Sequence, residues 1–262
     1  MPPSFASKYG PWAIVAGASQ GLGAAFASAL ASRGVHLLLL ARRAELLEDV
    51  AQELRTTFHV EVRAQACDLA RPDLPAALEA MSAGLDIGLG IYNAAYAPIG
   101  AFAAWPLEDL IRVVDVNVRG PLTFARTLAP VLIARGRGGL VLMSSLAGLQ
   151  GANRIAAYAA SKSFNTILGE GLWRELRPHG VDVVVACAGG IRTPAYAAAA
   201  AGREAPGTLD ADAIADATLA ALGRGPVVVP GAVNKLARFV LSRMLSRRAA
   251  IATFARSTKE LS

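Results

Sequence analysis

The segment WAIVAGASQGLG, residues 12–23, joins a short apolar run to a glycine-rich turn, and it indicates a strand followed by a helix. The run 12–17 has the length of a buried strand, and the small apolar residues from Gly21 to Arg33 indicate a helix packed closely on a sheet. Glycines at such a junction permit a tight turn and let a pyrophosphate approach backbone N–H groups at the helix N-terminus. A plain glycine-rich connector has the same composition, but the flanking strand and helix favour a nucleotide site.

Apolar runs alternate with amphipathic stretches along the rest of the chain. VHLLLLAR (35–42) is apolar throughout, as in a parallel strand covered on both faces. Further strands are predicted at 60–66, 87–94, 139–145, 181–187 and 226–230. Helices are predicted at 43–57, 73–83, 106–134 (with a break near Gly120-Pro121), 155–177 and 210–222. This order predicts an α/β fold in which a doubly wound parallel sheet (Rossmann fold) of about seven strands carries helices on both faces. We expect a single domain over residues 1–262.

Composition excludes several classes of protein. Of the 262 residues, 54% are hydrophobic and 18% charged, which permits a substantial core and argues against disorder. Cys67 and Cys187 lie far apart, which favours reduced thiols in a cytoplasmic protein over a disulfide framework. The three histidines are scattered without CxxC or HxxxH spacing, so no metal site is expected. The uncharged stretch 9–32 contains glycines and polar residues, unlike a signal or membrane anchor.

The net charge of +6 resides in the C-terminal segment. After residue 234 the only acidic residue is Glu260, and the basic residues are Lys235, Arg238, Arg243, Arg247, Arg248, Arg256 and Lys259. We expect residues 231–262 to form a basic helical extension, either packed on the body or a partner subunit with solvated arginines, or contacting an anionic surface. That surface would be a membrane or the phosphates of an acyl-CoA. Nucleic acid is not expected, because basic and aromatic residues do not interleave.

Two arginines follow the second strand. An acidic residue at that point binds the ribose 2′-hydroxyl of NAD, whereas this chain has Arg42 and Arg43. A guanidinium matches the geometry of a phosphate, so the 2′-phosphate of NADP is the expected partner. The alternative is a pair of solvated arginines at the start of a helix, where positive charge is unfavourable.

The sequence YAASK, residues 158–162, places Tyr158 about one helical turn before Lys162 on the same face. A phenol has a pKa of about 10, and a neighbouring ammonium lowers the pKa by favouring phenolate. Such a pair is able to donate and accept protons, although ordinary surface neighbours also share this spacing.

Together these features resemble the short-chain dehydrogenase/reductase family, in its form of about 250 residues, over roughly residues 10–230. The family's TGxxxGxG motif is matched by AGASQGLG (16–23), with alanine in place of threonine. Its NNAG motif appears as YNAA (92–95), and its PG-threonine segment appears as AGGIRT (188–193) without the proline. These departures affect local loop geometry.

The resemblance implies a catalytic set, which this chain fills with Asn117, Ser145, Tyr158 and Lys162. Tyr158 would protonate a carbonyl oxygen, Lys162 would lower the phenol pKa and hold the nicotinamide ribose, and Ser145 would hydrogen-bond the developing alkoxide. Asn117 would support a water chain that resupplies the proton. Structural alternatives are a serine that caps the strand end and an asparagine that satisfies backbone at the helix break.

The resemblance also implies which residues hold the expected NADPH or NADP+. They are Gly17, Ser19, Gln20, Gly21, Leu22, Gly23, Arg42, Arg43, Asp68, Leu69, Asn93, Ala94, Tyr158, Lys162, Gly189 and Thr193.

Within the family, segments 9–23 and 85–95 look like the branch of 17β-hydroxysteroid dehydrogenases and 3-oxoacyl-CoA reductases, which implies a bulky apolar carbonyl substrate. The expected substrate wall comprises Ser145, Leu146, Ala147, Asn153, Tyr158, Tyr96 and Tyr196. The small residues 197–201 would form either a pliable helical lid or a plain alanine-rich surface helix.

The resemblance therefore implies an NADPH-dependent oxidoreductase that reduces a ketone to a secondary alcohol. Two alternatives are a non-catalytic NADP-binding regulator or scaffold, and an alcohol dehydrogenase that acts mainly in the oxidative direction. Relatives are commonly dimers or tetramers, so we expect a homo-oligomer.

Overall fold

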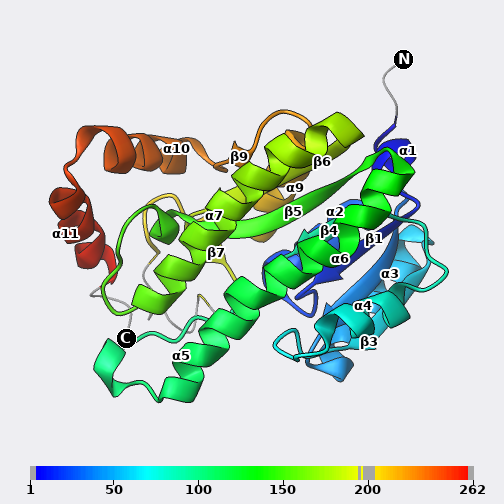
Figure 1. The fold of residues 1–262 in the computed structure, drawn as a ribbon, viewed down its shortest axis with the longest axis horizontal. Coiled ribbons are helices and arrows are strands. Elements are labelled where there is room, and N and C mark those ends of the chain that lie inside the picture. Colours follow the sequence, from blue (N-terminus) through cyan, green and yellow to red (C-terminus); the bar gives the residue numbers. More distant parts are fainter. Residues whose placement is uncertain (1–3, 194–195, 197–203, 259–262) are drawn as a thin grey trace.

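The computed structural model of the protein describes residues 4–193, 196 and 204–258. Seven parallel strands form one sheet in the order β3-β2-β1-β4-β5-β6-β9 (Figure 1). The strands are β1 (Trp12–Ala16), β2 (His36–Ala41), β3 (Val62–Ala66), β4 (Ile87–Tyr92), β5 (Gly138–Ser145), β6 (Val181–Ala188) and β9 (Val227–Val228). Because β1 pairs with both β2 and β4, the winding direction reverses there, and ligands of such sheets bind outside the carboxyl ends of these strands.

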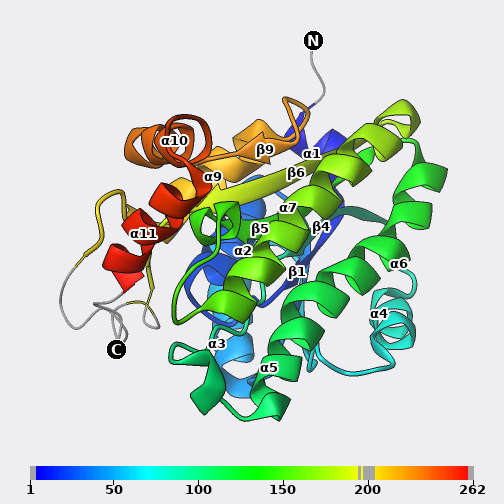
Figure 2. The ribbon, with the colours of Figure 1, turned by 60° about the vertical axis from the view of Figure 1, so that its left-hand side comes forward.

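Helices cover both faces of this sheet (Figures 1 and 2). One face packs against α2 (Gly21–Ala31), α3 (Ala44–Phe58) and α9 (Ala211–Ala221). The other packs against α4 (Leu74–Ser82), α6 (Gly120–Arg135) and α7 (Ala156–Leu176). The helix α5 (Leu107–Val114) leads into α6 through a π-helical turn at Asp115–Arg119.

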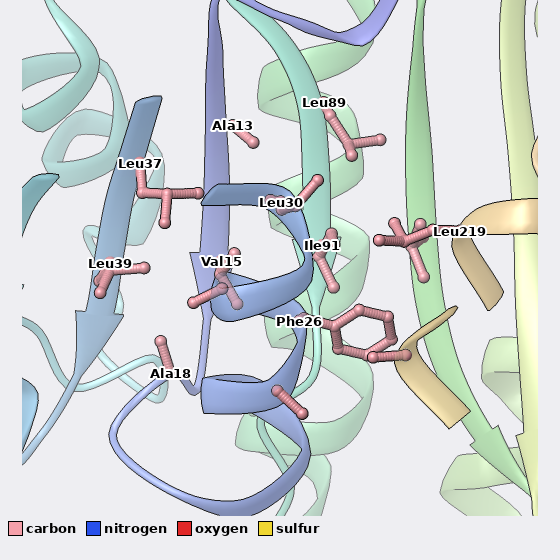
Figure 3. Close-up of a cluster of buried hydrophobic side chains, with 14 of the residues drawn as sticks. Ala13, Val15, Ala18, Phe26, Leu30, Leu37, Leu39, Leu89, Ile91 and Leu219 are labelled. Carbon is pink, nitrogen blue, oxygen red and sulfur yellow. The ribbon is translucent and has the colours of Figure 1, made fainter. Parts of the chain in front are cut away.

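Alternate residues of each strand enter opposite cores, because side chains of a strand point to its two faces in turn. Val15 and Leu39 belong to the same buried cluster as Phe26 of α2 (Figure 3), whereas Leu38 and Leu40 belong to the cluster on the other face, with Phe124 of α6. All these side chains are fully buried. The unbroken apolar runs of the sequence follow from this two-sided burial.

The predicted fold class is confirmed, and the differences are local. The expected break near Gly120-Pro121 is instead a π turn that lies just before Gly120, so the chain stays helical. Proline is tolerated there because it occupies the first turn of α6, where its missing N–H costs least. The last strand covers Val227–Val228 rather than 226–230. A short helix α1 (Phe5–Tyr9) and a small sheet of β7 (Ile191–Arg192) with β8 (Leu209–Asp210) were not predicted.

The basic C-terminal segment forms α10 (Ala232–Phe239), a π-helical turn at Val240–Met244 and α11 (Arg247–Thr258). In both views α11 lies beside the loop that follows β5 (Figures 1 and 2). The Arg247 guanidinium donates to the Leu149 carbonyl at 2.7 Å, and Ala250 is buried. No helix in the described ranges combines the length and hydrophobicity needed to cross a membrane.

Candidate active site

The turn between β1 and α2 requires glycine for two physical reasons. Gly17 and Gly21 have φ angles of +87° and +56°, which side chains other than glycine rarely adopt. A Cβ at Gly17 would lie 2.7 Å from the Ala94 Cα, and a Cβ at Gly23 would lie 1.9 Å from the Gly17 carbonyl oxygen. The turn is therefore pressed against the end of β4, and the N-terminus of α2 faces the space beyond it.

A cavity of about 350 Å³ occupies this space. It is bordered by most of the residues expected to hold the dinucleotide: Gly17, Ser19, Gln20, Gly21, Leu22, Arg42, Arg43, Asp68, Leu69, Asn93, Ala94 and Thr193. The sequence analysis did not anticipate Arg112, Val116 and Ile191 in the lining. Gly23, Gly189, Tyr158 and Lys162 do not border this cavity; a Cβ at Gly189 would lie 2.6 Å from the Asn234 Oδ1, so Gly189 permits close packing on α10.

Asn93 joins the two strand ends that frame the cavity. Its backbone N–H donates to the Ala16 carbonyl at 2.9 Å, and its side-chain amide donates to the Gly17 carbonyl at 2.9 Å. The asparagine kept from the family motif thus fixes the glycine turn against β4.

Three arginines surround the far end of the cavity. The Arg43 guanidinium lies 3.5 Å from the Ser19 hydroxyl, and Arg42 is exposed. Arg112, from α5, forms an ion pair with Asp68 at 3.0 Å. Burial raises the pKa of the Asp68 carboxyl, but the Ala70 N–H and the Arg112 guanidinium outweigh burial, so the net pKa is lowered. Because Asp68 stays ionised and engages Arg112, Arg42 and Arg43 remain the cations open to an anionic ligand.

Ser145, Tyr158 and Lys162 come together beside the end of β5. Ser145 is the last residue of that strand, and its hydroxyl accepts a hydrogen bond from the Ala147 N–H at 3.2 Å. Tyr158 and Lys162 lie one turn apart on α7, with the Lys162 Nζ 5.5 Å from the centroid of the tyrosine ring. The ammonium donates to the Met143 carbonyl at 3.1 Å, and the lysine side chain is buried.

Burial is the largest influence on the pKa values of Tyr158 and Lys162. It raises the pKa of Tyr158, an effect that the hydrogen bond with Ser145 opposes, and it lowers the pKa of Lys162 to about 8. The expected lowering of the tyrosine pKa by the ammonium is therefore not found, because removing both groups from water disfavours both charged forms. At neutral pH the phenol is protonated, the form that donates a proton.

Asn117 is completely buried in the π turn and links the loop after β4 to α7. Its Oδ1 accepts from the Tyr96 N–H at 2.8 Å, and its Nδ2 donates to the Tyr96 carbonyl at 2.8 Å and the Ser161 hydroxyl at 3.1 Å. Its backbone carbonyl lacks the usual α-helical donor four residues on, because Pro121 has no N–H. The side chain is thus fully used in positioning.

The π turn depends on a contact between Tyr92 and Gly120. The Tyr92 hydroxyl donates to the Val116 carbonyl at 2.6 Å inside the core. A Cβ at Gly120 would lie only 2.0 Å from that hydroxyl, so glycine leaves the space that the tyrosine occupies.

The expected substrate residues divide among several environments. Asn153 and Tyr158 border a second cavity of about 110 Å³, whereas Leu146 and Ala147 are buried in the helical turn that directly follows β5. Tyr96 borders the larger cavity and donates to Asp109 at 2.6 Å. The Tyr196 hydroxyl accepts from the Ala205 N–H at 2.9 Å, which braces its own loop. The stretch 197–201, considered as a lid, lies outside the described residues.

Two side chains near the second cavity were not anticipated. Arg154 borders it directly, and Phe254 of α11 packs on the cluster that contains Tyr158 and Ile155. Neither position carries a sequence signal, because only the fold brings the C-terminal helix to the start of α7. Among the residues that the structure describes, no group of three or more His, Cys, Asp or Glu side chains is arranged to hold a metal ion.

Comparison with known proteins agrees with this arrangement. The family model of the short chain dehydrogenases matches residues 11–204. A very-long-chain 3-oxoacyl-CoA reductase of Podospora anserina is 37% identical over 182 residues, which cover 67% of this chain and 53% of that protein. The chain therefore spans about half the length of this curated relative.

Two solved structures extend the likeness to three dimensions. A 7β-hydroxysteroid dehydrogenase aligns with a TM-score of 0.90 and 26% identity over 96% of this chain and 99% of its own. A short-chain dehydrogenase from Sphingobium yanoikuyae in complex with NADPH aligns with a TM-score of 0.77 and 32% identity, over 85% and 88% of the two chains. Since the family model covers most of the chain, including the glycine turn and the helix that carries YxxxK, this protein belongs to the short-chain dehydrogenase family.

Proposed function

We propose that the protein is an NADPH-dependent reductase that converts a ketone of a bulky apolar substrate into a secondary alcohol, with Tyr158 as the proton donor. The observation that carries the proposal is the position of Tyr158. It borders the second cavity, next to Ser145, on the helix that also carries Lys162. The names of the similar proteins, a 3-oxoacyl-CoA reductase and a 7β-hydroxysteroid dehydrogenase, support a large apolar carbonyl or hydroxyl compound as the substrate.

The larger cavity fits a dinucleotide with a 2′-phosphate. Side chains are excluded from its glycine turn, as the contacts of Gly17 and Gly23 demonstrate, so phosphate oxygens would meet backbone N–H groups at the start of α2. Arg42 and Arg43 would hold the 2′-phosphate, since neither forms an ion pair with a carboxylate among the described residues. When bound, NADPH supplies the hydride, and the protein supplies orientation and protons.

The catalytic residues would transfer the proton and stabilise the developing charge. Tyr158, kept protonated by burial, would donate its proton to the carbonyl oxygen, and the Ser145 hydroxyl would hydrogen-bond that oxygen as negative charge develops. Lys162 would hold the nicotinamide ribose and return the tyrosine proton, with a pKa near 8 suited to exchange at neutral pH. The backbone carbonyl of Asn117 would accept a water that connects the lysine to solvent.

We also propose that the C-terminal segment contacts an anionic surface, such as a membrane or the phosphates of an acyl-CoA. One face of α10 and the following π turn exposes the large apolar side chains Val233, Leu236, Phe239 and Met244. The cations Lys235, Arg238 and Arg243 lie among them, and no acidic residue occurs between Asp216 and Glu260. Apolar side chains flanked by cations favour the interface of an anionic bilayer.

A panel of apolar ketones, assayed for NADPH and NADH oxidation, tests the main proposal. We expect turnover with bulky ketones and a preference for NADPH. The double variant Arg42→Ala/Arg43→Ala should raise KM for NADPH by at least about 10-fold and leave NADH unchanged, because even one lost charge-assisted contact to a phosphate is worth about 1.5–3 kcal/mol. Absence of ketone turnover with either nucleotide would refute the reductase, and an unchanged nucleotide preference in the variant would refute the role of the arginines.

A further inference from the structure

The second cavity combines an apolar wall with one cation. It lies between the loop after β4, the start of α5 and the start of α7, and Tyr158 forms part of its lining. Pro98, Phe102, Trp105, Leu110 and Ile155 supply most of the remaining surface. Among the described residues of the lining, Arg154 is the only charged side chain, and no carboxylate is present there to balance it.

The Arg154 side chain also contains a buried nitrogen that has no hydrogen-bond partner. This nitrogen is the Nε, and among the described residues the guanidinium forms no ion pair. The large majority of buried hydrogen-bond donors in proteins have a partner, and leaving one unpaired costs stability. A guanidinium kept in this state beside an apolar cavity is suited to an anionic partner that the protein itself does not supply.

The backbone of Arg154 supports the same conclusion. Its φ angle is +66°, and His59 is the only other non-glycine residue with a positive φ in the described part of the chain. His59 ends α3, where the left-handed conformation commonly closes a helix. Arg154 precedes α7 instead, and its carbonyl accepts from the Gly100 N–H at 2.9 Å, which fixes the loop across the cavity. Strained residues of this kind concentrate at ligand sites, and glycine would fit here without strain.

We propose that Arg154 binds a carboxylate of the substrate, so that the enzyme selects apolar ketones that carry an acidic group. This inference rests on the proposed ketone reduction at Tyr158 and specifies its substrate class. The apolar wall would bury the carbon skeleton between the ketone and the carboxylate, and the guanidinium would form a charge-assisted hydrogen bond with the acid. Such a bond is worth about 1.5–3 kcal/mol, so removing the cation should cost about 10- to 150-fold.

The test compares oxo acids with their primary amides, in a series in which the ketone and the acid group are separated by one more methylene at each step. For the wild-type protein, we expect kcat/KM with NADPH to favour the acid over the amide by at least about 10-fold at the best spacing. Arg154→Gly, which relieves the backbone strain while removing the cation, should abolish that preference mainly through KM, and the amide should be reduced as before. Arg154→Lys should retain part of the preference, and Arg224→Gln, at an exposed turn at the other end of the sheet, should retain all of it.

Binding provides a readout that does not depend on turnover. Trp105 borders the cavity, so its fluorescence, with isothermal titration calorimetry, should report octanoate binding to the NADP+-saturated protein, and octanamide should bind more weakly. Equal acid and amide affinity in the wild type, or an acid preference that survives in a folded Arg154→Gly protein, would overturn the role of Arg154. If octanoate binds through Arg154 but no ketone is reduced, the proposed reaction fails and the anion site stands.

Discussion

Among single residues of the site, Lys162 carries a large desolvation cost. Its side chain is almost completely buried, and burial lowers its pKa from the usual 10.5 to about 8. A shift of that size corresponds to about 3 kcal/mol of unfavourable desolvation when the lysine is charged. This destabilising buried lysine lies next to Tyr158, as expected for a group that functions in proton transfer.

Lys162→Met should therefore stabilise the protein at pH 7 by on the order of 1–3 kcal/mol while abolishing turnover. The Met143 carbonyl keeps a partner in the variant, because it also accepts from the Asn165 amide at 3.2 Å. In the wild type the native lysine loses its proton near pH 8 and the unfolded lysine near 10.5, so stability should rise with pH in this range.

Urea unfolding of both proteins at several pH values from about 7 to about 9.5 measures this effect. The difference in unfolding free energy between variant and wild type should shrink as the pH rises, because titrations common to both proteins cancel. A variant that is less stable at pH 7, or a difference that does not depend on pH, would contradict the assignment.

Much of the site could be predicted at this scale. Glycines, Asn93, Asp68 and the two arginines follow strands at fixed offsets, and the topology of a doubly wound sheet brings strand ends together. Arg112 and Arg154 could not be predicted, because their approach to the cavities depends on how α5 and the loop before α7 cross the sheet end. The direction of the Tyr158 pKa shift was predicted wrongly, since burial, which raises this pKa, cannot be read from a four-residue spacing.

At the scale of elements, the π turn at Asp115–Arg119 positions the buried Asn117. Such turns insert one residue into a helix and recur at functional sites. Sequence periodicity predicted a helix with a break at Gly120-Pro121, because proline and glycine are the usual signals for one. The deciding interaction is between Tyr92 and Gly120, on separate elements, which no local pattern records.

The substitution Gly120→Ala should destabilise the protein by about 1–3 kcal/mol, because the new Cβ meets the Tyr92 hydroxyl. Tyr92→Phe alone should cost about 1–3 kcal/mol, since the buried Val116 carbonyl loses its donor. In the Tyr92→Phe background, adding Gly120→Ala should cost less than it does in the wild type, because the hydroxyl at 2.0 Å is gone and the nearest remaining atom is the ring Cζ at 2.8 Å.

Urea unfolding of the wild type, the two single variants and the double variant measures the coupling energy between Tyr92 and Gly120. Gly171→Ala in α7 is the matched control, since no atom lies within 4 Å of the added Cβ, and it should be neutral or stabilising. Equal costs of Gly120→Ala in the two backgrounds would show that the contact does not shape the π turn.

At the scale of the whole molecule, the C-terminal segment has two different faces. One side of α11 packs on the loop after β5 and on the cluster containing Tyr158, through Arg247, Ile251 and Phe254. The exposed side of α10 carries apolar and basic side chains. The sequence predicted the helices and their charge, but not that part of this extension would lie against the site. Deleting the segment would consequently uncover the site as well as remove the charge.

Reversing the charge of α10 separates a loss of surface binding from an uncovering of the active site. Lys235→Glu/Arg238→Glu/Arg243→Glu should abolish cosedimentation with phosphatidylserine vesicles, since each cation near an anionic surface contributes about 1 kcal/mol. Ketone reductase activity should persist, because these side chains lie outside both cavities. The control Arg126→Glu/Arg137→Glu/Arg224→Glu carries the same total charge at exposed positions elsewhere and should still bind. If the wild-type protein does not cosediment with anionic vesicles, or if both variants lose the same share of vesicle binding, the surface contact is rejected.

We propose that the Tyr158 hydroxyl delivers the proton during ketone reduction, and a single-turnover assay of Tyr158→Phe isolates this step. Protein saturated with NADPH is mixed with a bulky ketone, and the loss of nicotinamide absorbance is followed. We predict that the variant binds NADPH as tightly as the wild type and reduces the ketone at least about 100-fold more slowly. A variant that binds NADPH normally and keeps most of the wild-type rate would contradict the claim.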